Sequence, residues 1–405
     1  MPVLILGANF VWVSYNTILL LPLVQRVVPL ERASLTVGVI GFLATLVGLS
    51  VSILSGILSD HSSSRLGRRT PGILLGALLG LPVIASAGVL RLSLPIICLS
   101  YVGMQICTNI ANGAWWPLLV DAVPDNQRGL ASGLQGFYTL LAAAIGFLAV
   151  TYLNETGRPG LALITMGVVF ALSGVVCALA IRNYDNAPAA VGRFGLRQAF
   201  GDIFRVRTVV AVFFWVVLAS FWAHMGVNSM QYFARDFMRV YLALPNPDAG
   251  LRTMGIIQLT ITMVSAVACG LLSDRIGRRR IILLGVFGSA AGTLAMALSR
   301  SYAAFLVLSA LRSAATGPIF AVIPALASGL APSDEAGQYM AYANVATGLS
   351  GAVSSLLFGA ILNLQGEATP ASFVTLLVVA AAFFAVGGGV IAVRVPQAEL
   401  ERRPG

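Results

Sequence analysis

The sequence predicts an all-α membrane protein in which twelve transmembrane helices form two pseudo-symmetric six-helix bundles. Hydrophobic residues make up 58% of the 405 residues and charged residues only 10%, whereas a soluble domain has about 25% charged residues. A water-soluble fold of this length would leave too much apolar surface exposed. A polar motif that occurs once in each half of the chain indicates the twofold repetition.

Twelve stretches, uncharged except for Arg312 in one of them, are each long enough to cross a bilayer, which takes about 17–25 residues as a helix. Helices are required because lipid offers no hydrogen-bonding partner to backbone amides, and the alternation typical of barrel strands is absent. The expected spans are residues 3–25, 35–58, 71–90, 94–120, 129–153, 160–181, 208–234, 253–273, 281–298, 302–330, 337–363 and 370–393.

A long polar stretch follows the sixth span and divides the chain. It reads RNYDNAPAAVGRFGLRQAFGDIFRVR and covers residues 182–207. We expect an N-terminal bundle at 1–181, a cytoplasmic linker with a short amphipathic helix near 195–204, and a C-terminal bundle with a short cytoplasmic tail at 208–405. The first apolar run has no basic segment before it, so we interpret it as the first helix and not as a cleavable signal peptide.

The arginines predict the orientation. All 25 basic residues are arginines, and placing both termini on one side puts sixteen on that side and eight on the other, with Arg312 inside a span. Cytoplasmic loops carry the excess of positive charge, so we expect both termini in the cytoplasm and a multi-pass protein in the plasma (inner) membrane. Charge that follows membrane sidedness in this way argues against a nucleic-acid site. The four cysteines lie inside spans without metal-ligand spacing, so we interpret them as packing residues.

The repeated motif follows the second span of each half. The first copy is GILSDHSSSRLGRRTP, starting at Gly56, and the second is GLLSDRIGRRR, starting at Gly270, with a four-residue insertion in the first. A weaker echo, VPDNQRGLASG at 123–133 and APSDEAGQYMA at 331–341, lies between the fourth and fifth spans of each half. Duplicated six-helix halves are typical of transporters.

A Gly-x-x-x-Asp element followed by Gly-Arg-Arg, repeated at these two places, resembles the signature of the major facilitator superfamily over essentially the whole chain. The resemblance implies the major facilitator fold and secondary transport by alternating access. The longer first copy, together with NIANGAWWPLLVDAVPDNQRGLASG, resembles the glycoside–pentoside–hexuronide symporters and the sucrose-transporter-like proteins. That branch implies a sugar or glycoside as substrate.

The charged residues of the motif suggest a gate. Asp60, at a helix end, can pair with Arg69 or Arg128, and such a cluster stabilises one conformation and breaks in the other. The alternative is that these arginines only set topology. The gating candidates are Gly56, Asp60, Gly67, Arg68, Arg69, Asp121, Arg128, Gly270, Asp274, Gly277, Arg278 and Arg279.

Polar side chains inside spans are costly and point to a pathway or a partner. The clearest set follows i, i+4, i+8, i+11 and i+15 on one face of the fourth span; it is Tyr101, Gln105, Asn109, Asn112 and Trp116. Further cavity candidates are Asn9, Trp12, Asn16, Gln135, Tyr138, His224, Asn228, Gln231, Gln258, Arg312, Tyr342 and Asn344. Amides, indoles and phenols suit a polyhydroxylated ligand; the alternative is hydrogen bonding that only joins helices.

Four positions bear on charge and coupling. Arg312 is the only permanent charge well inside a span; it binds an anionic substrate group, or it satisfies backbone carbonyls or reaches an interface. His224 is the one mid-span group suited to a proton relay near neutral pH, with plain hydrogen bonding as the alternative. The sodium-coupled melibiose-permease type carries two aspartates on the second span, where this chain has Gly48 and Ser52. We therefore expect protons as the coupling ion.

The chain is therefore expected to be a secondary active transporter of a sugar, glycoside or sugar acid, acting as a monomer in the lipid bilayer. The nearest alternative is a drug or metabolite exporter of the same fold, because fold does not settle substrate. A non-transporting receptor and a membrane enzyme are more remote. No Gly-x-x-x-x-Gly-Lys loop and no HExxH motif is present, so the sequence gives no signal for an enzyme, a cofactor or a metal.

Overall fold

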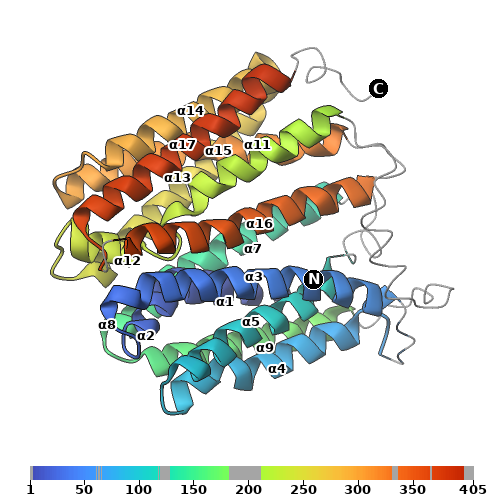
Figure 1. Cartoon of the computed structure of the whole chain (residues 1–405). Helices are drawn as coiled ribbons and strands as arrows, with labels where there is room; N and C mark the ends of the chain where they lie inside the picture. Colours follow the sequence, from blue (N-terminus) through green and yellow to red (C-terminus); the bar gives the residue numbers. More distant parts are fainter. Residues whose placement is uncertain are drawn as a thin grey trace. The chain divides into compact units, whose positions relative to one another are not determined.

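The computed structural model of the chain is helical wherever it describes secondary structure (Figure 1). It describes residues 3–60, 62, 64, 66–116, 118, 128–181, 211–330, 336–364 and 367–395, without the side chains of 60, 128–133, 135, 136, 274, 325, 328, 329, 336–338, 340 and 341. The expected linker, its amphipathic helix and Asp121 lie outside these residues, as do the side chains of Asp60, Arg128, Gln135 and Asp274.

Twelve helices within the described ranges are long and apolar enough to cross a membrane, and the protein is a multi-pass membrane protein. Several of these helices begin a few residues before the apolar stretch that predicted them, because a polar first turn extends the helix beyond the hydrocarbon. The spans are Val3–Val24, Leu30–Ser59, Thr70–Val89, Leu94–Trp115, Phe137–Glu155, Pro159–Ile181, Ala211–Met230, Pro247–Ser273, Arg278–Met296, Tyr302–Pro324, Tyr342–Asn363 and Pro370–Arg394.

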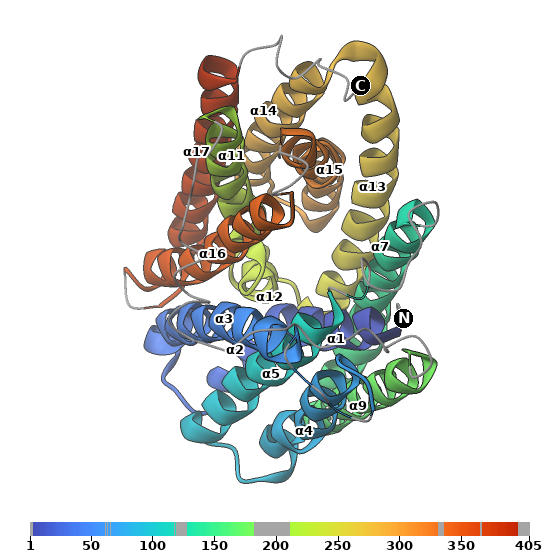
Figure 2. The same ribbon diagram turned by 90° about the vertical axis from the view of Figure 1, so that its right-hand side faces the viewer.

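The first compact unit comprises Met1–Pro29 and Leu43–Phe204. In it α9 packs along α4 and α1, and α4 packs along α5 (Figure 2). Small residues permit these contacts: a Cβ at Gly174 of α9 would overlap Ala77 of α4. The helices are α1 (Val3–Val13), η1 (Ser14–Leu19), α2 (Leu20–Val24), α3 (Leu30–Asp60), α4 (Thr70–Val89), α5 (Leu94–Trp115), α7 (Arg128–Ile145), η3 (Gly146–Val150), α8 (Thr151–Glu155) and α9 (Pro159–Ile181).

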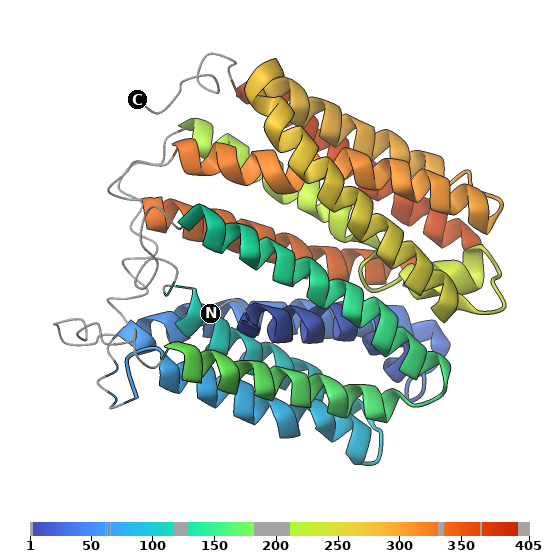
Figure 3. The same cartoon turned by 180° about the vertical axis from the view of Figure 1, so that it is seen from behind.

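The second unit comprises Leu30–Phe42, the start of α3, and Arg205–Gly405. In it α15 packs against both α13 and α14, which Figure 3 shows from behind in gold and orange. The helices are α11 (Ala211–Val227), η4 (Asn228–Met230), α12 (Ala234–Asp236), η5 (Phe237–Tyr241), α13 (Pro247–Ile276), α14 (Arg278–Met296), α15 (Tyr302–Leu330), α16 (Ala336–Asn363) and α17 (Pro370–Arg394).

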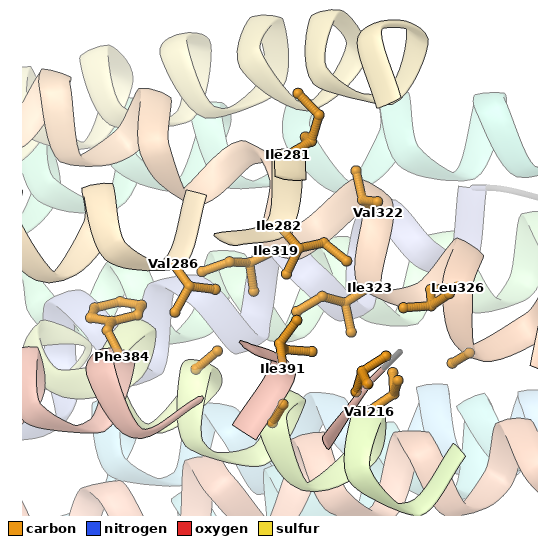
Figure 4. Packing of buried hydrophobic residues seen from close by; sticks show 14 of the residues in the cluster. Val216, Ile281, Ile282, Val286, Ile319, Val322, Ile323, Leu326, Phe384 and Ile391 are labelled. Atoms are coloured by element: carbon orange, nitrogen blue, oxygen red, sulfur yellow. The ribbon is translucent and has the colours of Figure 1, made fainter. Parts of the chain in front are cut away.

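The core of the second unit is aliphatic and aromatic (Figure 4). Ile319 of α15, Val286 of α14 and Phe384 of α17 are each 0–1% exposed and belong to one cluster with Val216 of α11. A dense core of this kind holds the four helices in fixed register, because a packed interior yields little to deformation. Side chains at the edge of this core are therefore held in fixed positions.

Three spans that we expected to be continuous α-helices contain irregular turns. The spans predicted at 3–25 and 129–153 contain the π-helical turns η1 and η3, and the span predicted at 208–234 runs into the 3-10 turn η4. A π-turn accommodates one extra residue and is frequent at functional sites. The two π-turns are in contact, and a Cβ at Gly146 of η3 would lie 2.7 Å from the hydroxyl oxygen of Ser14 in η1.

Candidate functional site

The glycine before the paired arginines of the repeated motif has a positive φ angle in both copies. Gly67 has a φ angle of 100° and Gly277 one of 101°, a region that side chains rarely tolerate. Helix α4 then begins at Thr70 after the two arginines, whereas α14 begins at Arg278 directly after the glycine. The two glycines that the sequence alignment pairs therefore share a positive φ angle, which only glycine adopts without strain.

The motif arginines contact their own unit. A guanidinium nitrogen of Arg69, 2% exposed, donates to the hydroxyl of Ser59 at 3.3 Å. Arg279 donates to the carbonyl oxygen of Ala392 at the end of α17, at 2.6 Å. These bonds join the loop after α3 to that helix, and the start of α14 to α17. The expected pairing of Asp60 with Arg69 or Arg128, and the role of Asp274, involve side chains outside the described part.

The glycine that starts each motif is not tightly confined by its neighbours. A Cβ at Gly56 would lie 3.5 Å from the carbonyl oxygen of Gly113, and one at Gly270 would lie 4.0 Å from Ala321, both ordinary contacts. Gly113 of α5 is the confined residue, because a Cβ there would overlap the carbonyl oxygen of Ser52 on α3. The close approach of helices α3 and α5 thus depends on a glycine that the motif does not contain.

The first unit places Asn16 and Tyr101 together. The Tyr101 hydroxyl, fully buried, donates to Oδ1 of Asn16. One residue earlier on each helix, Tyr15 donates to the Ser100 hydroxyl at 2.9 Å. Asn16 Nδ2 is enclosed and has no hydrogen-bond partner among the described residues. This is the interhelical bonding that we weighed as the alternative to cavity lining, with one donor left over.

The polar face of α5 changes character along its length. Gln105 is 4% exposed, while Trp116 is 48% exposed. Asn109 donates to the Gln105 carbonyl at 2.8 Å and packs on α3, where a Cβ at Gly48 would lie 2.8 Å from its Nδ2. The Oδ1 of Asn112 is enclosed and has no partner in the described chain. The face therefore begins in the packed interior and ends at an exposed indole.

The remaining candidates of the first unit differ in environment. Asn9 donates to the Ile5 carbonyl in its own helix at 2.9 Å, and Trp12 is 40% exposed, whereas Asn16 is buried. Tyr138 is half-buried and packs edge-on against Phe137 at 5.7 Å between ring centroids. Asn9, Trp12 and Asn16 thus have different surroundings in the structure.

The second unit contains a pocket between α11, α15 and α16. Its volume is about 150 Å³, and its polar lining comprises Ser220, His224, Asn344 and Thr347. The apolar lining is Val216, Val217, Phe320, Ile323, Pro324, Ala327 and Ala343. His224 and Asn344 were predicted from sequence; Ser220, Thr347 and Phe320 were not, although Ser220 lies one turn before His224.

His224 is oriented by its own helix. Its Nδ1 lies 2.8 Å from the Ser220 carbonyl oxygen, and a carbonyl oxygen only accepts, so Nδ1 carries a hydrogen. Nε2 is then the ring nitrogen that carries no hydrogen in the neutral imidazole. The Phe320 ring stands edge-on at 5.8 Å between centroids. The pocket thus combines a titratable ring, hydroxyls, an amide and an aromatic face.

The other candidates of the second unit lie apart from this pocket lining. Asn228 donates to Ser350 on α16 at 3.5 Å, which continues the polar contact between α11 and α16. Gln231, Gln258 and Tyr342 are half-buried. Arg312 is 8% exposed, and its Nε and Nη1 are enclosed without a hydrogen-bond partner in the described chain.

These features define a class of protein: a polytopic membrane protein built from two repeated halves, with polar groups set among apolar helices. Comparison with known proteins gives the family. The sequence model of the Major Facilitator Superfamily matches residues 3–245 and again 218–404. The chain belongs to the Major Facilitator Superfamily and is a membrane transporter of that type.

Solved structures of transporters are similar over the whole chain. A bacterial homolog of the human lysosomal transporter Spinster, inward-facing and unoccupied, is 14% identical, with a TM-score of 0.75 over 100% of this chain and 98% of that one. The nucleoside transporter NupG, as a mutant, is 12% identical, with a TM-score of 0.74 over 98% of both chains. At such identities the likeness shows the fold.

Among curated proteins, the MFS-type transporter clz19 of Cochliobolus lunatus is 40% identical over 70 residues. These residues make up 17% of this chain and 13% of that protein. The likeness therefore agrees with the family and says little about substrate.

Proposed function

We propose that the protein transports a sugar, glycoside or sugar acid together with protons, by alternating access of its two halves. The observation that carries the substrate class is the pocket of the second unit. Its hydroxyls, amide and imidazole offer donors and acceptors to a polyhydroxylated molecule, and Phe320 offers a face of the kind that sugar rings stack on. The resemblance of the first motif to the glycoside–pentoside–hexuronide branch supports the same choice.

The first unit, taken by itself, also contains polar atoms that a ligand could satisfy. Asn16 Nδ2 and Asn112 Oδ1 are enclosed polar atoms without partners among the described residues. An amide left unpaired in an apolar interior is costly, and a ligand hydroxyl would satisfy it. The gating role of the repeated motif, the cytoplasmic termini, the plasma membrane, the boundaries of the two bundles and the monomeric state belong to this same proposal.

Coupling to protons follows from His224 and from the packing at Gly48. A Cβ at position 48 would lie 2.8 Å from the Asn109 Nδ2, so a side chain there would require Asn109 to shift. The second span has Gly48 and Ser52 where a sodium site built from carboxylates would need acids, whereas His224 Nε2 can carry a proton.

Export of an apolar compound is the second candidate. The observation that favours it is the pocket wall, where seven of the eleven lining residues are apolar. Transport assays in intact cells that produce the protein distinguish the two functions. Uptake of radiolabelled sugars and sugar acids above an empty-vector control supports the proposal, and its absence together with reduced dye accumulation would support export.

A further inference from the structure

Arg312 lies where α15 packs against α14. A Cβ at Gly292 of α14 would lie 3.0 Å from the Cβ of Arg312, so the start of the arginine side chain is enclosed between the two helices. The residue is 8% exposed and lies ten residues after the first residue of α15. The chain thus places a guanidinium, which keeps its charge at physiological pH, inside a transmembrane segment.

This guanidinium has no partner in the described chain. Nε and Nη1 are enclosed without a hydrogen bond; Nη2 is not among the enclosed atoms. The hydroxyls of neighbouring turns donate within α15: Ser309 to the Leu306 carbonyl at 2.9 Å and Thr316 to the Ser313 carbonyl at 2.9 Å. Nε and Nη1 of Arg312 satisfy no backbone carbonyl among the described residues.

No described acid forms an ion pair with Arg312. The sequence holds no Asp or Glu between Arg275 and Ser333. Asp236 pairs with Arg239 at 3.1 Å and Asp248 with Arg235 at 2.9 Å, so these two acids have their own arginines. An isolated buried charge is unfavourable, and in membrane proteins such groups mark substrate sites.

We propose that Arg312 binds the carboxylate of the transported molecule, so that the substrate is a sugar acid and not a neutral sugar. This inference rests on the proposed function. A guanidinium matches a carboxylate with two parallel N–H···O bonds, and the unpaired nitrogens of Arg312 are available for them. The bound pair of guanidinium and carboxylate would carry no net charge.

The test compares ligands that differ in charge and protein variants in which the substituted arginine lies at different positions. D-glucuronate, D-glucose and lactate are added to the purified full chain in detergent, and the shift in melting temperature gives affinity, because a ligand of the folded state stabilises it. Arg312→Gln removes the charge, Arg312→Lys keeps it, and Arg300→Gln removes the same charge at an exposed position. We expect glucuronate to stabilise the wild type and Arg300→Gln, and to bind Arg312→Gln at least about 30-fold more weakly.

Without ligand, Arg312→Gln should melt no lower than the wild type, because an unpaired buried charge is removed. A clear loss of stability would reveal a structural partner and overturn the inference. Equal binding of glucuronate to the wild type and Arg312→Gln, or binding of glucose alone, would overturn it while the sugar proposal stands. Stabilisation by lactate alone, lost in Arg312→Gln, would keep the anion site and refute the sugar. If neither acid stabilises the wild type, the inference fails.

Discussion

Gly113 and Gly56 face each other where α5 approaches α3. The space available for a side chain differs between the two positions. The Cα of Gly113 points at the backbone of the other helix, so that a Cβ would overlap the Ser52 carbonyl oxygen and lie 2.9 Å from the Ser55 Cβ. A Cβ at Gly56 would make only an ordinary van der Waals contact. The Ser55 hydroxyl donates to the Ile110 carbonyl at 2.6 Å, which the close approach permits.

Gly113→Ala should therefore lower the free energy of unfolding by about 1–3 kcal/mol, the usual cost of overpacking. Gly56→Ala is the matched control and should be neutral or slightly stabilising, because alanine favours a helix by about 1 kcal/mol over glycine. Thermal unfolding of the two purified variants measures the difference. Equal melting temperatures would show that the helices separate at no cost.

At the scale of single residues, the sequence predicts which face of a helix is polar better than it predicts which residues surround that face. The spacing of Gln105, Asn109 and Asn112 predicted one polar face, and the structure keeps it on α5. That Asn109 packs on Gly48 depends on which helix lies opposite, and spacing carries no such information. Ser220 and Thr347 were missed because a hydroxyl inside a span is usually bonded to its own helix.

The turns of the repeated motif are the clearest feature at the scale of the element. Gly277 ends α13 with φ 101° and ψ 134°, and Gly67 has nearly the same φ in the other half. The turn fixes where the following helix starts, and so where Arg279 reaches the end of α17. The aligned glycines of the sequence therefore predicted an element that recurs in space.

Gly277→Ala should destabilise the second unit by about 1–3 kcal/mol, because a side chain at this φ and ψ is strained. Gly389→Ala in α17 is the control, since a Cβ there meets nothing within 4 Å. Melting temperatures in detergent compare the two. A Gly277→Ala variant as stable as Gly389→Ala would contradict the strained turn.

Helix ends were predicted less well than helix number. Apolar runs indicate the stretch within the hydrocarbon, so the span predicted at 35–58 begins as a helix at Leu30, with Glu31 and Arg32 in its first turn. The irregular turns η1 and η3 could not be read from composition. They form where Gly146 meets Ser14, and that contact depends on the packing of two helices distant in sequence.

At the scale of the whole molecule, the family and the duplicated motif describe a transporter made of two related halves. The sequence predicts this architecture because hydrophobic length and repetition are properties of the chain itself. The substrate is a property of a few polar atoms, such as Asn16 Nδ2, His224 Nε2 and the Arg312 nitrogens. Their meaning depends on what surrounds them, so the sequence alone left each with an alternative.

The central claim is proton-coupled uptake of a sugar or sugar acid, and flux in proteoliposomes tests it most directly. Purified wild type and His224→Gln are reconstituted with an imposed pH gradient, and labelled glucose and glucuronate are followed. We predict that the wild type accumulates one of these above equilibrium when the outside is acidic, and that a sodium gradient at fixed pH has no effect. His224→Gln should exchange the same substrate across the membrane without accumulating it. Accumulation driven by sodium, or no flux of either compound, would contradict the account.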